Sequence, residues 1–128
     1  MRLLLDTHAF IWWVNGSERL PRRARRAIDS AANVVFVSAA SAWEITTKYH
    51  RGRLDEAVAL APDVPGAIAD QDFEELPITV ADAARAGALP GPHRDPFDRM
   101  LIAQALSRDL VLISNDAAFD RYPVRRLW

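Results

Sequence analysis

The sequence predicts a three-layer α/β fold, in which helices cover both faces of a central, mostly parallel sheet of four to five strands. Short apolar runs that suit buried strands alternate with segments that suit helices, which is typical of parallel strands joined by right-handed crossovers. Half of the 128 residues are hydrophobic and 26% are charged, the balance of a folded globular protein. No repeat or linker interrupts the pattern, so we expect a single domain over residues 1–128.

Turn and capping residues mark the elements of the first half. Gly16 follows the first helix-like segment and should end it, and Pro21 suits the first turn of the next helix. Ser41 and Glu44 have the spacing of a capping box, so Ser38 or Ser41 should cap a third helix. The expected elements are a strand over Arg2–Leu5, a helix over Thr7–Val14, a helix from Pro21 to about Ala32, a strand over Val34–Val37 and a helix that reaches Arg51 before Gly52.

Prolines divide the second half. Pro62 and Pro65 interrupt the helix-like stretch 54–72, which we therefore expect to form two short helices. Asp95 before Pro96 is typical of a helix start, and the helix that follows is apolar on most sides and should be buried. The expected elements are a strand over Phe73–Ile78, a helix over Thr79–Ala88, a loop over Leu89–Arg94, the buried helix to about Asp109, a strand over Leu110–Ser114, a helical turn over Asp116–Asp120 and an edge strand over Val124–Leu127.

Composition excludes several classes of function. The chain has no cysteine, which excludes disulfide scaffolds, thiol catalysis and zinc sites built on cysteine. Asp6 and His8 interrupt the apolar start, and no stretch reaches the ~20 apolar residues of a membrane span, so we expect a soluble cytoplasmic protein without membrane contact.

The basic residues are biased toward arginine. The net charge is −1, but 15 of the 16 basic residues are Arg, whose planar fork binds phosphate at two points. This bias is compatible with RNA contacts and equally with a solvated helix face that packs on a partner. The clustered residues are Arg22, Arg23, Arg25, Arg26, Arg125 and Arg126.

Four carboxylates are expected to meet at one edge of the sheet. Asp6 ends the first strand, and Asp116 comes two residues after the apolar run that ends at Ser114. Glu44 and Asp98 lie in the first turns of helices that begin at the same edge. Open parallel sheets bind ligands beyond the carboxyl ends of their strands, so the sequence predicts a site there.

Each of these acids also has a purely structural interpretation. Asp6 and Asp116 could cap the helical segments that follow them. Glu44 could belong to the capping box or pair with Lys48, four residues further on. Asp98 suits the positive end of a helix dipole, but it shares a helix face with apolar residues that should point inward. A carboxylate there needs a metal or a cationic partner, because an unpaired buried charge is too costly.

A single metal site explains the position of all four acids together. Their mutual repulsion would keep them apart unless a divalent cation compensated it. Ligand sets made only of oxygen select hard ions such as Mg²⁺ and Mn²⁺. Of the three histidines, His8 could line the pocket, whereas His50 and His93 are expected to be structural or exposed.

Four segments around these acids form a set of motifs. They are Met1-Arg-Leu-Leu-Leu-Asp6-Thr-His, Ser41-Ala-Trp-Glu44-Ile, Pro92-His-Arg-Asp-Pro-Phe-Asp98-Arg-Met-Leu-Ile-Ala-Gln-Ala105 and Leu112-Ile-Ser-Asn-Asp116. In this order they resemble the motifs of PIN-domain ribonucleases, and most closely those of the VapC-type toxins of toxin–antitoxin pairs. The resemblance runs from residue 1 to about residue 126, and the segment from His93 to Arg99 is its most specific part.

The resemblance implies a role for each matching residue. The catalytic and metal-binding acids would be Asp6, Glu44, Asp98 and Asp116. Asp6 and Asp98 would be the central ligands. The supporting residues would be Asp95, Thr7 and Ser114, the last at a position where relatives often carry Thr. Arg94 and Arg99 flank the site, and they are candidates either for contact with RNA phosphate or for surface pairing with helix acids.

The resemblance also implies an activity and partners. Such proteins are Mg²⁺-dependent or Mn²⁺-dependent endoribonucleases with a PIN-like fold, and they cleave structured cellular RNA, often tRNA or ribosomal RNA. They form homodimers, and a VapB-like antitoxin holds them inactive in a toxin–antitoxin hetero-oligomer. An RNA substrate and an antitoxin partner are therefore expected here.

Two other classes are the alternatives. A haloacid-dehalogenase-like phosphatase needs Asp-x-Asp after the first strand, where this chain has Asp6-Thr7-His8, and a later phosphate-binding lysine, for which Lys48 comes too early. A non-catalytic antitoxin-binding or RNA-binding module would use the acids only to receive a basic partner. The complete set of four acids argues against such a module.

Overall fold

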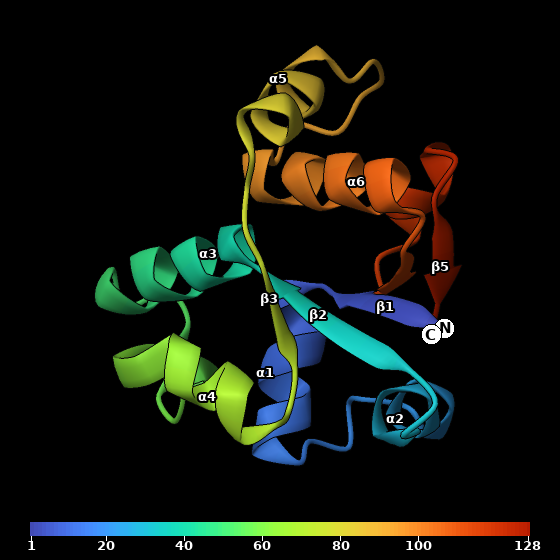
Figure 1. Cartoon of the computed structure of the whole chain (residues 1–128). Coiled ribbons are helices and arrows are strands. Elements are labelled where there is room, and N and C mark those ends of the chain that lie inside the picture. The colour runs from blue at the N-terminus through green and yellow to red at the C-terminus, as the bar shows by residue number, and fades with distance from the viewer.

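A sheet of five parallel strands forms the centre of the computed structural model, which describes residues 1–128 (Figure 1). The strands are β1 (Arg2–Leu5), β2 (Val34–Ser38), β3 (Glu74–Leu76), β4 (Val111–Ile113) and β5 (Arg125–Leu127). Their order is β3-β2-β1-β4-β5, so the sheet grows in one direction from β1 through β2 and in the other through β4. The predicted α/β fold with a parallel sheet is confirmed.

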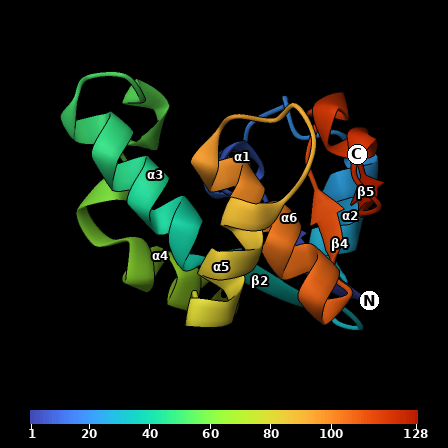
Figure 2. The ribbon, with the colours of Figure 1, turned by 90° about the horizontal axis from the view of Figure 1, so that it is seen from above.

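Helices cover both faces of the sheet, as predicted. The helices are α1 (Thr7–Asn15), α2 (Arg22–Asp29), α3 (Ala39–His50), α4 (Val64–Asp70), α5 (Val80–Ala88) and α6 (Pro96–Arg108), with short 3₁₀ helices η1 (Asp55–Ala57), η2 (Ala61–Asp63) and η3 (Ala117–Arg121). Figure 1 shows α1, α2 and α4 below the sheet and α5 and α6 above it. Seen from above, α6 lies beside α5 and close to α3 (Figure 2). None of the helices has the length and apolar character that crossing a membrane would require.

Alternation along β1 divides the apolar core between the two faces. Leu3 and Leu5 pack with residues of α1 and α2, whereas Leu4 packs with Leu101 and Ile102 of α6. All five side chains are fully buried. Because strand side chains alternate between faces, a central strand covered on both sides needs the continuous apolar run that the sequence shows.

The predicted start of α3 is confirmed at Ser38, one of its two candidate caps, whereas the predicted start of α2 is wrong in detail. Ser38 caps α3 by accepting a hydrogen bond from the backbone N–H of Ala40 at 3.0 Å, so the helix begins before Ser41. The capping box predicted for Ser41 and Glu44 therefore does not form. Pro21 occupies the N-cap position of α2 rather than its first turn, and the helix ends at Asp29 instead of near residue 32.

The stretch over residues 54–72 is less helical than predicted. It contains η1, η2 and a single α-helix, α4. Pro62 lies inside η2 and Pro65 lies in the first turn of α4. Since proline has no N–H to donate, a regular helix cannot run through both positions, and the chain folds into separate turns.

Candidate functional site

The four predicted carboxylates line one pocket at the carboxyl edge of the sheet. The pocket has a volume of about 170 Å³, and its walls include Asp6, Glu44, Asp98 and Asp116. Asp6 follows β1 and Asp116 follows β4, and between these two strands the order of the sheet reverses direction. Open parallel sheets bind ligands at this switch point. The structure therefore brings together acids that are far apart in the sequence.

Three acids of the pocket also cap helices. Asp6 Oδ1 accepts a hydrogen bond from the backbone N–H of Ala9 at 2.7 Å, and Asp116 Oδ1 accepts one from Ala118 at 2.9 Å. Asp95, which lines the same pocket, caps α6 in the same way. The structural interpretation of these residues is thus correct. Capping nevertheless fixes each carboxylate at the pocket wall, so a structural role and a shared site coexist.

Glu44 is held by two neighbouring side chains. Its Oε1 accepts a hydrogen bond from the Thr7 hydroxyl at 2.5 Å, and its Oε2 pairs with Lys48 one turn along α3. Burial acts to lower the pKa of Lys48, but the hydrogen bond and charge of Glu44, with the charges of Asp95 and Asp98, raise it above its usual value. Lys48 therefore brings a positive charge into the pocket. The four-residue spacing predicts its pairing with Glu44 but not its place in the site.

Ser114 connects the two acids that follow β1 and β4. Its side chain is fully buried, and its Oγ accepts a hydrogen bond from the backbone N–H of Asp116 at 3.0 Å. A hydrogen bond from the same hydroxyl opposes the rise in the pKa of Asp6. The contacts place Ser114 and Thr7 beside the acids that they are predicted to support.

The central carboxylates resist ionisation in the metal-free chain. Burial, followed by the negative charges of Asp95, Glu44, Asp6 and Asp116, raises the pKa of Asp98 to about 7. Burial also raises the pKa of Asp6 to about 6, although hydrogen bonds to its carboxylate act in the opposite direction. Burial, which penalises the charged form, is the main cause of both shifts, and for Asp98 the charges of the neighbouring acids add to it. A pocket with several carboxylate oxygens and this electrostatic deficit fits a hard divalent cation.

The structure places His93 beside this cluster, although the sequence predicts a structural or exposed residue. His93 Nε2 lies 3.0 Å from Asp98 Oδ2. One ligand atom from each of His93, Asp98 and Asp116 lies within 4.8 Å of the others. His93 belongs to the irregular segment before α6, where neither periodicity nor cap spacing marks a side chain that points inward. The other predicted neighbour, His8, does line the pocket.

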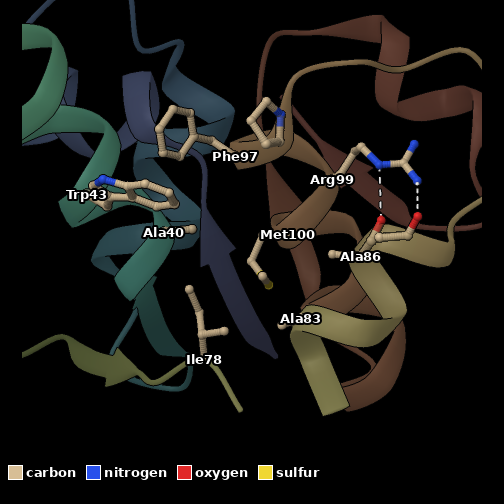
Figure 3. A pocket seen from close by; sticks show the side chains of 10 residues that line it. Ala40, Trp43, Ile78, Ala83, Ala86, Phe97, Arg99 and Met100 are labelled. Carbon is tan, nitrogen blue, oxygen red and sulfur yellow. Dashed lines mark hydrogen bonds between the residues drawn. The ribbon is translucent and has the colours of Figure 1, made fainter. Parts of the chain in front are cut away.

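Arg99 does not serve as a phosphate contact. Its guanidinium donates hydrogen bonds to the backbone carbonyls of Ala86 at 3.0 Å, Leu89 at 2.5 Å and His93 at 3.0 Å. Figure 3 shows the side chain reaching from α6 to the end of α5. A guanidinium committed to carbonyl oxygens in this way braces the loop between the two helices, so the predicted RNA contact is corrected for this residue. Arg94 is exposed, and its contact with RNA phosphate or with a helix acid stays a prediction.

A second, apolar pocket lies on the other side of the same helix start. Trp43 of α3 packs edge-on against Phe97 of α6, with ring centroids 5.1 Å apart, and Met100 and Ile78 lie nearby in the pocket wall (Figure 3). Trp43 is 63% exposed. The two pockets share the first turn of α6 but differ in chemistry, since carboxylates line one and apolar side chains line the other.

Comparison with protein families adds an independent finding. The model of the PIN domain matches residues 3–125. A search of characterised proteins finds Ribonuclease VapC22 of Mycobacterium tuberculosis, which is 30% identical over 115 residues, spanning 89% of this chain and 86% of that protein.

Solved structures show the same fold. The complex VapBC2 of Rickettsia felis, bound to a DNA fragment from its promoter, contains a chain that matches with a TM-score of 0.71 and 15% identity, covering 99% of this chain and 98% of that one. VapC20 of Mycobacterium tuberculosis, a toxin that cleaves the sarcin-ricin loop, matches with a TM-score of 0.64 and 18% identity over 93% of each chain.

Proposed function

Because this chain belongs to the PIN-domain family and resembles a VapC ribonuclease over most of its length, we propose that it is a Mg²⁺-dependent or Mn²⁺-dependent endoribonuclease and the toxin of a toxin–antitoxin pair. The observation that carries the proposal is the single pocket in which four carboxylates from separate segments meet. The raised pKa values of Asp6 and Asp98 support a cation at that place.

We propose a separate role for each residue of the pocket. Asp6 and Asp98, the two acids with raised pKa values, would be the central ligands of the ion. Asp116 and Glu44 would complete the site or orient water, and Asp95 would support them. When bound, the divalent ion supplies Lewis acidity at the phosphoryl oxygens and makes water a better nucleophile. Thr7 and Lys48 hold Glu44 in place through its two oxygens.

The substrate belongs to the same proposal. The related VapC20 cleaves the sarcin-ricin loop, and by that likeness we propose structured cellular RNA, tRNA or ribosomal RNA, as the substrate. Arg94 is exposed next to the acidic pocket and remains our candidate for a contact with RNA phosphate.

The proposed partner is a VapB-like antitoxin. Several structures with this fold are toxin–antitoxin complexes, among them VapBC of Salmonella typhimurium and FitAcB of Neisseria gonorrhoeae. A basic antitoxin side chain that reaches Asp6 and Asp98 would stabilise their charged forms, which burial now disfavours. We also propose a homodimer, for which the exposed Trp43 beside the apolar pocket is a candidate contact.

The test is RNA cleavage by purified chain that is free of antitoxin. Total RNA would be incubated with the protein and Mg²⁺ or Mn²⁺, with EDTA, and with the variants Asp6→Ala and Asp98→Ala. Asp70→Ala is the matched control, because Asp70 is exposed at the end of α4 and away from the pocket. We expect cleavage that EDTA and both pocket substitutions abolish and that the control retains.

The alternatives predict different results. Cleavage that withstands EDTA or both substitutions would contradict a metal-dependent nuclease. Release of phosphate from small esters without RNA cleavage would favour the phosphatase. Tight binding of RNA or of a basic partner without any cleavage would favour the non-catalytic module.

A further inference from the structure

His93 presents a buried ring nitrogen that has no hydrogen-bond partner. Its Nε2 is buried and lies at ion-pair distance from Asp98 Oδ2, but the two groups do not have hydrogen-bond geometry. Buried polar atoms in proteins are nearly always satisfied, so an exception needs an explanation. A ligand that is bound in the working protein is one such explanation.

The position of His93 is fixed from three sides. Its backbone N–H donates to the Tyr122 hydroxyl at 3.2 Å, and its backbone carbonyl accepts from Arg99 at 3.0 Å. Its ring packs edge-on against Phe119, with centroids 5.8 Å apart. These contacts hold the ring beside Asp98 before any ligand arrives, which is the arrangement expected of a preorganised ligand residue.

The distances around Nε2 match those between the ligands of one ion. Two ligands at right angles around an ion with bonds of roughly 2.1 Å lie about 3.0 Å apart. The separation of His93 Nε2 and Asp98 Oδ2 is 3.0 Å. Asp116 belongs to the same group, since one possible ligand atom from each of His93, Asp98 and Asp116 lies within 4.8 Å of the others, close enough for one ion after a small side-chain movement.

We propose that His93 Nε2 is a nitrogen ligand of the same divalent ion that Asp98 and Asp116 bind. This inference rests on the proposed metal-dependent function and extends it. A nitrogen ligand changes the preference of the site, because imidazole suits first-row transition metals better than it suits Mg²⁺, which prefers oxygen. The site would therefore favour Mn²⁺ over Mg²⁺ more strongly than a set of carboxylates alone.

The test is the electron spin echo spectrum of the full chain loaded with Mn²⁺. A histidine nitrogen bound directly to Mn²⁺ produces a ¹⁴N modulation that carboxylates and water do not produce. We expect this modulation in the wild-type chain and its loss in His93→Gln. The variant His8→Gln is the matched control, because His8 also lines the pocket, and it should retain the modulation.

Titration calorimetry on the same samples adds a second readout. We expect His93→Gln to weaken Mn²⁺ binding by at least about tenfold and Mg²⁺ binding by less. Circular dichroism would show whether both variants are folded. The electron spin echo spectrum of the wild-type chain tests the proposal even if a variant does not fold.

The outcomes distinguish failure of the proposed role of His93 from failure of the proposed metal-dependent function. A wild-type chain that binds Mn²⁺ without a ¹⁴N modulation would overturn the role of His93 and leave the metal-dependent function standing. Loss of the modulation in His8→Gln but not in His93→Gln would assign the nitrogen to His8 and overturn the inference as well. A wild-type chain that binds neither Mn²⁺ nor Mg²⁺ would overturn both proposals.

Discussion

The two ends of α6 place an aspartate in opposite electrostatic environments. At the carboxyl end, Arg108 donates to both carboxylate oxygens of Asp82 at 2.8 Å, and this hydrogen bonding holds the pKa of Asp82 well below its usual range. At the amino end, burial and neighbouring acids raise the pKa of Asp98 to about 7. The same residue type is therefore stabilised as an anion at one end and destabilised as an anion at the other.

The difference lies in where the compensating cation comes from. Asp82 receives its cation from the chain itself, and the pair joins α5 to α6. In the acidic pocket, Lys48 is paired with Glu44, and burial together with neighbouring acids keeps the pKa values of Asp6 and Asp98 raised. We infer that the first arrangement serves stability and the second reserves a place for an external cation, either a metal ion or a basic partner side chain.

The largest effect should follow from the loss of the carboxylate at the amino end. We expect Asp98→Asn to reduce RNA cleavage by at least about a hundredfold, the scale on which the loss of one group that stabilises transition-state charge is felt. Single-turnover cleavage of a defined RNA would measure the change, with Asp70→Asn as the control. A variant that keeps more than a tenth of the wild-type rate would remove Asp98 from the site.

The second effect is a loss of stability at the carboxyl end. We expect Asp82→Asn to lower the free energy of unfolding by about 2–3 kcal/mol, because it leaves the Arg108 guanidinium without its charged partner. Urea denaturation would measure the change. Asp98→Asn should not lower the free energy of unfolding of the metal-free chain. Equal destabilisation by the two substitutions would contradict the difference between the two ends of α6.

A third prediction concerns the hydrogen bonds by which Arg99 holds the segment before α6. We expect Arg99→Met to lower the free energy of unfolding by about 2 kcal/mol, because backbone carbonyls that now accept from the guanidinium lose a charged donor. Arg94→Met, in the same segment but exposed, is the control and should leave thermal stability unchanged. If the two substitutions had the same effect, the bracing role of Arg99 would be wrong.

The last prediction is a dependence of stability on pH. The pKa values of Asp98 and Asp6 are raised to about 7 and about 6 in the folded chain, so between about pH 4 and pH 7 the folded chain binds more protons than the unfolded chain. Each pKa unit is worth about 1.4 kcal/mol, so stability of the metal-free protein should fall by up to several kcal/mol as the pH rises through this window. Urea denaturation at a series of pH values, in EDTA, measures it.

Two results would sharpen this prediction. Mn²⁺ should reverse the fall at pH 8, and Asp98→Asn should flatten the curve. The Asp82 pair does not interfere, because its folded-state pKa is lowered and its stabilisation is lost only in more acidic solution. Stability that rises between pH 5 and pH 8 without metal would contradict uncompensated charge in the pocket.

The sequence predicts those parts of the site that regular structure positions. Asp6 and Asp116 follow buried parallel strands, and strand ends share an edge of the sheet, so their convergence follows from the order of the elements. The place of Asp98 in the first turn of α6 follows from the cap at Asp95, and its inward direction follows from the buried face of the helix. The positions of these residues follow from strand ends and a helix cap, which can be recognised in the sequence and whose geometry is regular.

The remainder depends on contacts between irregular segments. His93 and Arg99 acquire their roles from the loop between α5 and α6, whose path no periodicity determines. Lys48 pairs with Glu44 as its spacing predicts, but the spacing shows neither that Lys48 lines the pocket nor that α3 starts directly after Ser38. Capping by either serine satisfies the same sequence pattern, so the sequence alone could not choose between them.

The most direct measurement is a ¹³C NMR titration of the aspartate carboxyl groups, in EDTA and in saturating Mg²⁺. We expect Asp98 to titrate near pH 7 without metal, far above its usual value, and Mg²⁺ to move this midpoint well into the acidic range. Asp82, with its own cation, should not respond to Mg²⁺. A midpoint near pH 4 for Asp98 in both conditions would contradict a single cation site formed by the four carboxylates.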